Sequence, residues 1–139
     1  MLFRSGLLIP QLNPFYSIEV APPLVAHWAN PITMRMLCGT NHSVYGFTMF
    51  DQELQCHCRG VAGQRWHVVS SAVLRPRMYL TKPGYAAHER LHVEDIRRRL
   101  ARHLASIAQI DFASETDCTK AATQEMRAFP QWMAKAIRE

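Results

Sequence analysis

The sequence lacks any apolar run close to the roughly 20 residues that span a bilayer, so we expect no membrane-spanning helix. It is also poor in charge: Asp, Glu, Lys and Arg make up 19% of the 139 residues, against about 25% in an average globular domain. Hydrophobic residues make up 48%, which excludes disorder over the whole length. No internal repeat or low-complexity tract is present. A chain of this length is long enough for one globular core and too short for two.

The N-terminal residues lack the apolar centre of a secretory signal peptide. The run Leu7–Ile9 is interrupted by Pro10, far short of the usual ~7–15 residues, so we identify no signal peptide in this sequence. Further prolines interrupt every candidate element up to Pro31. We therefore predict that residues 1–31 form an irregular N-terminal arm, in which residues 15–20 are the one candidate for a short strand.

Four cysteines leave the redox state open. Their even number permits disulfides, for example between Cys118 and either Cys56 or Cys58. On a strand, Cys56 and Cys58 would share one face. The alternatives are reduced, buried thiols and a structural zinc site formed by Cys38, His42, Cys56 and Cys58. The Cys-x-Cys spacing of that site is tighter than in the common zinc knuckle.

Strand patterns occupy the middle of the chain. Segments rich in β-branched and aromatic residues predict an antiparallel meander with strands at 32–37, 44–50, 54–59, 66–74 and 78–81. The polar pair Asp51-Gln52 reads as a turn between two of them. Pro76 predicts that the last strand lies at an edge of the sheet or carries a bulge.

Helix patterns occupy the last third of the chain. Apolar residues recur at helical spacing after residue 84, at Ile96, Leu100, Leu104 and Ile107. Residues 115–128 predict a second helix, and Pro130 is expected to separate it from a short helical piece at 131–139. The predicted fold is therefore α+β: a small antiparallel or mixed sheet followed by two packed helices, with residues 32–139 as a single domain.

The motif His88-Glu89-Arg90-Leu91-His92, near the start of the first helix, is the chemically informative part of the sequence. Residues i and i+4 lie one turn apart on the same side of a helix, so His88 and His92 can bind one zinc ion. Glu89 does not reach the metal directly, but it can take a proton from a metal-activated water. Chance alone would produce this pattern roughly 0.02 times in such a chain. Because both histidines continue the stripe through Ile96, we expect them to point inward.

The motif helix, the strands before it and the cysteine after it resemble a family of small bacterial zincins, described as predicted secreted zinc-dependent proteases. The resemblance covers residues 44–128 and is strongest at residues 68–74, at the His88–His92 motif and around Cys118. It implies that His88 and His92 bind zinc and that Glu89 is the catalytic base. It also implies a small mixed sheet packed on the motif helix and a second helix, and a location outside the cytoplasm.

Zincins need a third protein ligand, and the resembling family would have it as a further His after the second helix. The sequence contains no His after His103, and His103 lies about 16 Å along the helix from His92, so we interpret it as a core or rim residue. Arg98 stands where metzincins have their third His. The acidic candidates are Glu125 and Glu139, because a hairpin of the two helices places them nearest the pair. Otherwise water or a partner chain would complete the site.

Several residues near the motif are expected to have structural roles. Asp95 is predicted to pair with Arg99 at i+4 rather than to orient an imidazole. Tyr79 and Tyr85 are predicted to pack in the core rather than to stabilise an oxyanion.

We predict a zinc-dependent peptidase that hydrolyses a peptide or protein substrate with a metal-activated water. The free edge of the last strand before the motif helix, at residues 68–80, would pair with the substrate backbone. The alternative is a non-catalytic zincin-like module that binds a protein or nucleic acid through its basic surface, since the net charge is +5. We expect Arg97, Arg98 and Arg102 to face solvent and any nucleic-acid binding to be weak and salt-sensitive. The sequence leaves the oligomeric state open.

Overall fold

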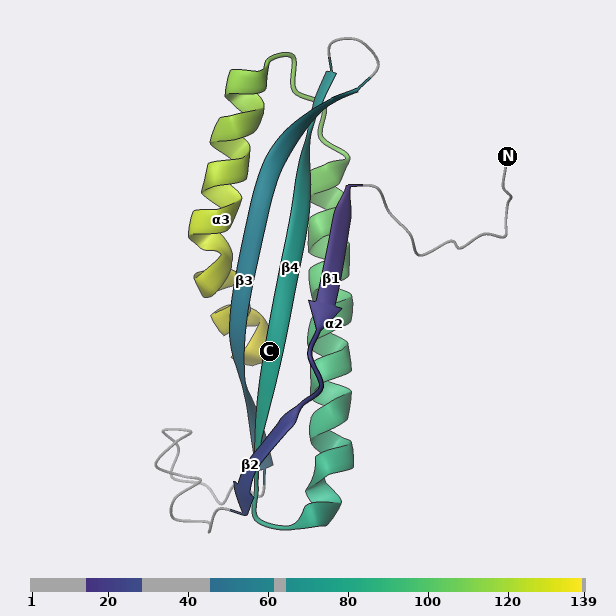
Figure 1. The fold of residues 1–139 in the computed structure, drawn as a ribbon, viewed down its shortest axis with the longest axis vertical. Helices are drawn as coiled ribbons and strands as arrows, with labels where there is room; N and C mark the ends of the chain where they lie inside the picture. The colour runs from purple at the N-terminus through teal and green to yellow at the C-terminus, as the bar shows by residue number, and fades with distance from the viewer. Residues whose placement is uncertain (1–14, 29–45, 62–64, 139) are drawn as a thin grey trace, which may run out of the picture.

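The computed structural model describes residues 15–28, 46–61 and 65–138. Its elements are, in chain order, β1 (Tyr16–Val20), β2 (Leu24–Trp28), β3 (Gly46–Val61), β4 (Arg65–Leu80), the short 3-10 helix η1 (Pro83–Tyr85), α2 (Ala86–Ala108) and α3 (Glu115–Arg138). They form two layers, with both helices on one face of a sheet (Figure 1). The predicted α+β fold, in which a mixed sheet precedes two helices, is confirmed. None of the described helices has the length and apolar character needed to cross a membrane.

The sheet is built around β4 as its central strand. β3 pairs with β4 in antiparallel fashion along its whole length, from Gly46 opposite Leu80 to Val61 opposite Arg65. β1 and β2 both pair with the other edge of β4 in parallel. Figure 1 shows these two strands following one another along that edge. The strands therefore fill three positions of a mixed sheet rather than an antiparallel meander.

β3 is one continuous strand where the sequence predicted two. The predicted strands at 44–50 and 54–59 join without a turn at Asp51-Gln52. Asp51 fits a strand because its carboxylate pairs with Arg77 of β4 across the exposed face, at 3.3 Å. A polar residue that alternates onto the solvent face does not interrupt pairing. The further strand expected at 32–37 lies outside the described residues.

Pro76 lies within the central strand, so the prediction of an edge or a bulge was wrong. The Ala21 N–H donates to the Leu74 carbonyl at 2.9 Å, so the backbone of Leu74 faces the edge occupied by β1 and β2. Pro76, two residues further on, faces the same edge. There β1 has ended and β2 has just begun, with Leu24 opposite Arg77. Its missing N–H therefore removes no bond from the ladder.

The candidate short strand at residues 15–20 is confirmed as β1, whereas β2 at Leu24–Trp28 forms where we expected an irregular arm. The side chains of Tyr16, Ile18 and Val20 in β1 pack against the core. Pro22 and Pro23 lie between β1 and β2 rather than inside either strand. The sequence of this segment shows only a weak strand pattern. The edge of β4 that β3 leaves open supplies the hydrogen-bond partners that order it.

The core lies between the sheet and the helices. Even-numbered residues of β4 face the helices and are buried from Val68 to Leu80, including Ala72 and Leu74. The predicted apolar stripe of α2 is also buried, which confirms that this face packs on the sheet. α3 contributes Phe129 and Met133, among others, to the same core.

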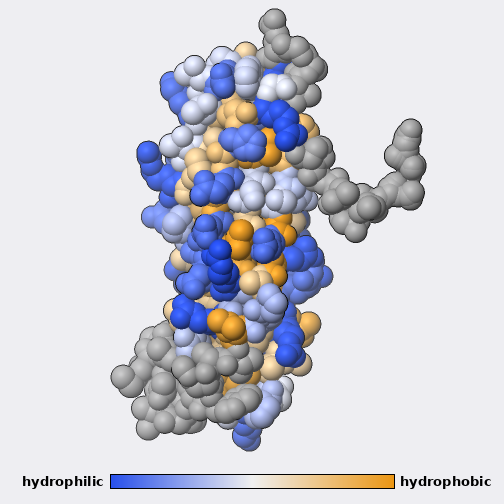
Figure 2. Space-filling model, viewed as in Figure 1, coloured by the Kyte–Doolittle hydropathy of each residue, from blue (hydrophilic) through white to orange (hydrophobic). Residues whose placement is uncertain are grey.

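The opposite face of the sheet carries the odd-numbered residues of β3 and β4, and no described helix covers it. Arg75 pairs with Glu53 across this face at 2.7 Å, beside the pair formed by Arg77. Figure 2 shows apolar surface there as separate patches among hydrophilic side chains. Met49 is an exposed residue of this face of the sheet.

α3 continues through Pro130, which we expected to end it. A proline inside a helix removes the hydrogen bond to the carbonyl four residues earlier, here that of Met126. Packing of Phe129 and Met133 in the core holds the helix together on both sides of this interruption.

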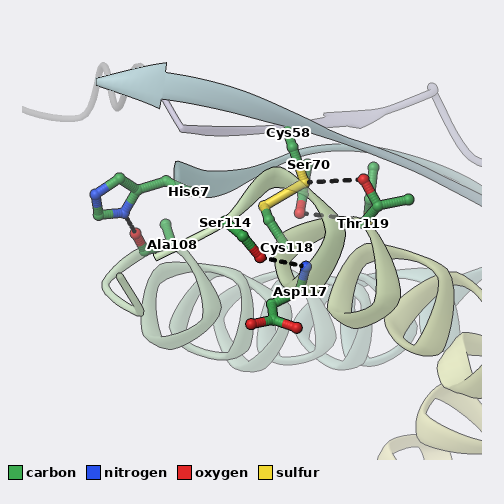
Figure 3. Close-up of a disulfide and its surroundings, with 9 residues drawn as sticks. Cys58, His67, Ser70, Ala108, Ser114, Asp117, Cys118 and Thr119 are labelled. Carbon is green, nitrogen blue, oxygen red and sulfur yellow. Dashed lines mark hydrogen bonds between the residues drawn. A yellow bond between two sulfur atoms is a disulfide. The ribbon is translucent and has the colours of Figure 1, made fainter. Parts of the chain in front are cut away.

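A disulfide joins α3 to the sheet. Cys58 of β3 bonds to Cys118 in the first turn of α3, with a Cα–Cα distance of 6.1 Å (Figure 3). The Ser114 hydroxyl accepts a hydrogen bond from the Asp117 N–H at 3.1 Å and caps the helix start beside it. One of the pairings predicted for Cys118 is thus present. A zinc site that uses Cys58 is excluded, and its other members Cys38 and His42 lie outside the described residues.

Cys56 is the free cysteine of the described residues. Burial raises the pKa of its thiol above the ordinary value, so less thiolate is present at a given pH. We predict that iodoacetamide alkylates Cys56 more slowly than an exposed thiol at pH 8, and that the rate keeps rising with pH beyond the titration of free cysteine. Mass spectrometry of a Cys38→Ser variant measures this rate. A titration midpoint at or below that of free cysteine would contradict the prediction.

Candidate metal centre

The first two turns of α2 bring the imidazoles of His88 and His92 together. Their Nε2 atoms lie 3.0 Å apart, and the two rings are nearly perpendicular, at 88°. Two nitrogens bound to one tetrahedral zinc ion at ~2.0–2.1 Å are about 3.3 Å apart. A small change in side-chain torsions therefore brings both nitrogens onto one ion, and the donor set fits zinc.

Both histidines are exposed, whereas we expected them to point inward. The buried stripe of α2 runs instead through Glu89, Val93 and Ile96. A step of four residues turns a helix about 40° more than one full turn. Two such steps backward from Ile96 to His88 thus rotate the side chain about 80° away from the core. The pair therefore lies at the surface, in contact with solvent.

Glu89 is held in a fixed position beside the pair. Its side chain is buried, with 3% of its surface exposed. The Thr48 hydroxyl donates a hydrogen bond to Oε1 at 2.7 Å. Candidate ligand atoms of Glu89, His88 and His92 lie within 4.8 Å of one another, a separation that one water molecule can bridge. The carboxylate is therefore placed to act on a water at the two imidazoles.

Gly46 creates the space for this carboxylate. A Cβ atom at position 46 would lie 3.3 Å from Glu89 Oε2 and 3.1 Å from Leu80 Cδ2. Both contacts are closer than ordinary van der Waals distances. Gly46 is the first residue of β3 and pairs with Leu80 at the end of β4. The Glu89 carboxylate therefore packs against the open end of the β3–β4 hairpin.

A pocket of about 410 Å³ opens beside Glu89 and His92. The start of β3, α2 and the last turn of α3 form its walls. Arg99 of α2 pairs with Asp95 at 3.0 Å, as predicted, and donates to the Ala136 carbonyl of α3 at 3.4 Å. Arg99 therefore holds the last turn of α3 beside the motif, a connection that the sequence analysis missed.

The candidate third ligand Glu125 is engaged elsewhere. Its Oε1 lies 3.1 Å from His103 Nε2, and His103 also stacks on Trp132 with ring centroids 5.0 Å apart. This position is about 16 Å along α2 from His92, so His103 is a rim residue, as expected. Glu139 lies outside the described residues. Within the part of the chain that the structure describes, no further His, Cys, Asp or Glu joins the motif group.

Of the two tyrosines near the motif, only Tyr85 packs in the core as predicted. Tyr79 instead lies on the outer face of the sheet, where it stacks on Phe47 with ring centroids 4.9 Å apart. Tyr85 packs against the small apolar cluster that contains Met78 and Leu80.

The arginines of α2 divide into two kinds. Arg98 and Arg102 are exposed, as expected. Arg97 is half-buried and forms a bidentate contact with Glu94, which lowers the pKa of that carboxyl. Arg98 and Arg102 are therefore exposed surface charges, whereas the charge of Arg97 is paired with that of Glu94.

β4 does not offer a free edge to a substrate, so that part of the prediction was wrong. Both of its edges are paired, one with β3 and the other with β1 and β2. On the outer side of β3, the Cys56 N–H donates to the Met126 sulfur of α3 at 3.4 Å. The central part of that edge is thus also covered, and the pocket at the start of β3 is the accessible recess next to the motif.

The motif residues singled out in the sequence thus lie together at one end of the molecule, with two supporting residues that sequence reasoning missed. His88, Glu89 and His92 form a group of suitable ligand types. Thr48 and Gly46 come from β3, and no local pattern connects them to the motif. The arrangement can hold a metal ion beside a fixed carboxylate. Comparison with protein-family models, curated proteins and solved structures gives no match.

Proposed function

We propose that the protein is a zinc-dependent peptidase. The observation that carries this proposal is a pair of exposed imidazoles, with nitrogens 3.0 Å apart, next to a buried carboxylate that a hydroxyl holds in place. The adjoining pocket gives a substrate room to bind beside that carboxylate.

Each residue has a distinct role in this proposal. His88 and His92 would hold the zinc ion. When bound, zinc supplies a Lewis acid that lowers the pKa of water and polarises a peptide carbonyl. Glu89 takes a proton from the attacking water and delivers it to the leaving amine. Thr48 keeps the carboxylate in one orientation, because its hydrogen bond fixes Oε1.

Zinc content tests the site. Tag-free protein, measured by elemental analysis, should contain one zinc per chain, and His92→Ala should lose it because one imidazole alone binds weakly. The matched control is His57→Ala, which removes an exposed histidine from β3 and should retain full zinc. Full zinc in His92→Ala would place the metal elsewhere and contradict the proposal.

Peptide hydrolysis tests the reaction. Zinc-loaded protein should cleave an unstructured protein substrate, and His92→Ala should not. Stoichiometric zinc without hydrolysis would favour the second candidate, a non-catalytic module. That candidate draws support from the exposed Arg98 and Arg102, which form part of a basic surface. It also draws support from the ligand group, because the described residues add no further protein ligand to the two imidazoles and the carboxylate of the motif.

A further inference from the structure

We infer that the pocket beside Glu89 binds an apolar side chain of the peptide substrate, and that Ile137 of α3 determines this preference. The inference deepens the proposed peptidase function and rests on it. It starts from the composition of the pocket, its charges and the way its outer wall is held.

The pocket has one buried and one exposed apolar wall. Ile96 of α2 and Ala136 of α3 are buried, while Phe50 of β3 is half-buried. Ile137, which follows Ala136 in the last turn of α3, forms the exposed apolar wall, with 43% of its surface exposed. All four line the pocket. An apolar group bound in the pocket would cover Ile137. Binding would then be favoured because apolar surface of both partners is removed from water.

The charges of the pocket disfavour ionic side chains of either sign. Asp95 is paired with Arg99, and Glu89 accepts a hydrogen bond from Thr48. Arg99 offsets the charge of Asp95, and the remaining charges of Glu89 and Arg138 are of opposite sign. An acidic side chain would be repelled by Glu89 and a basic one by Arg138, so neither sign gains a net electrostatic advantage in the pocket. An apolar side chain avoids all of these interactions.

The size and rigidity of the pocket fit this ligand class. Its volume of about 410 Å³ lies in the lower part of the ~300–1,000 Å³ range of small-ligand sites. That is enough for one large side chain and the adjoining backbone. Met133 and Ala136 are buried in the core, and Arg99 donates to the Ala136 carbonyl. The turn that carries Ile137 is therefore held in place without a ligand.

Binding of blocked amino acids provides a direct test that does not depend on catalysis. N-acetyl amides of Leu, Phe, Ala, Lys and Asp are titrated into zinc-loaded protein and followed by NMR. We expect the Leu and Phe compounds to bind at least about tenfold more tightly than the others, since hydrophobic pockets discriminate by this factor or more. Equal affinities across the series would overturn the inference.

Variants of Ile137 assign the preference to its wall. Ile137→Asp should abolish the tenfold preference, and Ile137→Ala should reduce it. The matched control is Ile110→Asp, at a similarly exposed isoleucine just after the C-terminal end of α2, which should leave the preference unchanged. An unchanged preference in folded Ile137→Asp would overturn the role given to Ile137.

A peptide library separates this inference from the peptidase proposal. Cleavage enriched next to Leu or Phe supports both. Cleavage with no side-chain preference overturns the pocket inference and leaves the peptidase standing. Selective binding of the Leu and Phe amides without any cleavage overturns the peptidase and leaves the pocket as an apolar binding site.

Discussion

Glu89→Gln should retain near-normal zinc and lose at least about a hundredfold of its peptidase activity. General acid–base catalysis is typically worth ~10²–10⁴-fold, and glutamine cannot accept the proton of the attacking water. The substitution keeps the size of the side chain, which matters at a residue that is 3% exposed. The glutamine oxygen can still accept the hydrogen bond from Thr48. Zinc content and the initial rate of hydrolysis on the same preparation measure the two effects.

Variants of Thr48 provide the control for this prediction. Thr48→Ser keeps a hydroxyl within reach of Glu89 Oε1 and should keep most of the rate. Thr48→Val removes the donor and should lower kcat while zinc remains bound. Unchanged hydrolysis in Glu89→Gln would mean that another base, or a contaminant, is responsible. Loss of zinc together with activity would show that Glu89 supports the metal itself.

Reduction of the Cys58–Cys118 disulfide should lower the free energy of unfolding by about 2–4 kcal/mol. The bond closes a loop between residues 60 positions apart, and a crosslink of that span strongly restricts the unfolded chain in the chain-entropy account. Urea denaturation with and without a reducing agent measures the difference. A Cys58→Ala/Cys118→Ala double variant should lose a similar amount without any reductant.

Cys56→Ala is the matched control for the disulfide. It removes a thiol two residues from Cys58 on the same strand, and it leaves the crosslink in place. We expect Cys56→Ala to respond to the reducing agent as fully as the unmodified protein does. Equal stability of oxidised and reduced protein would contradict the prediction.

The sequence predicted the parts of the fold that depend on local patterns. The apolar residues change from alternating to helical spacing near residue 84. This change correctly predicted that both helices follow the strands in the chain. The i, i+4 spacing identified His88 and His92 because the helix itself brings them together. The same reasoning failed when the apolar stripe of α2 was extended backward from Ile96 to the two histidines. Each four-residue step rotates the side chain further around the helix, so His88 and His92 face solvent instead of the core.

Contacts between distant segments could not be read from the sequence. Thr48 lies 41 residues before Glu89, and only the register of the β3–β4 hairpin brings it there. The parallel pairing of β1 and β2 depends on an open edge of β4 that no local pattern reveals. Asp51 resembles a turn residue in isolation, and its partner Arg77 becomes visible only once the strands are paired.

Pro130 divides α3 into two mechanical units with different anchors. The first half is tied covalently to β3 through Cys118. The last turns, which carry the pocket wall, follow an interruption in the helical hydrogen bonds, the usual point at which a helix bends. The disulfide therefore restrains the part of α3 before Pro130 more than the turns that follow it. Beyond Pro130 the last turns are held by burial of Met133 and Ala136 in the core and by the Arg99 contact with the Ala136 carbonyl. The geometry of the pocket therefore depends on the sheet and on the helix that bears the motif more than on the covalent anchor.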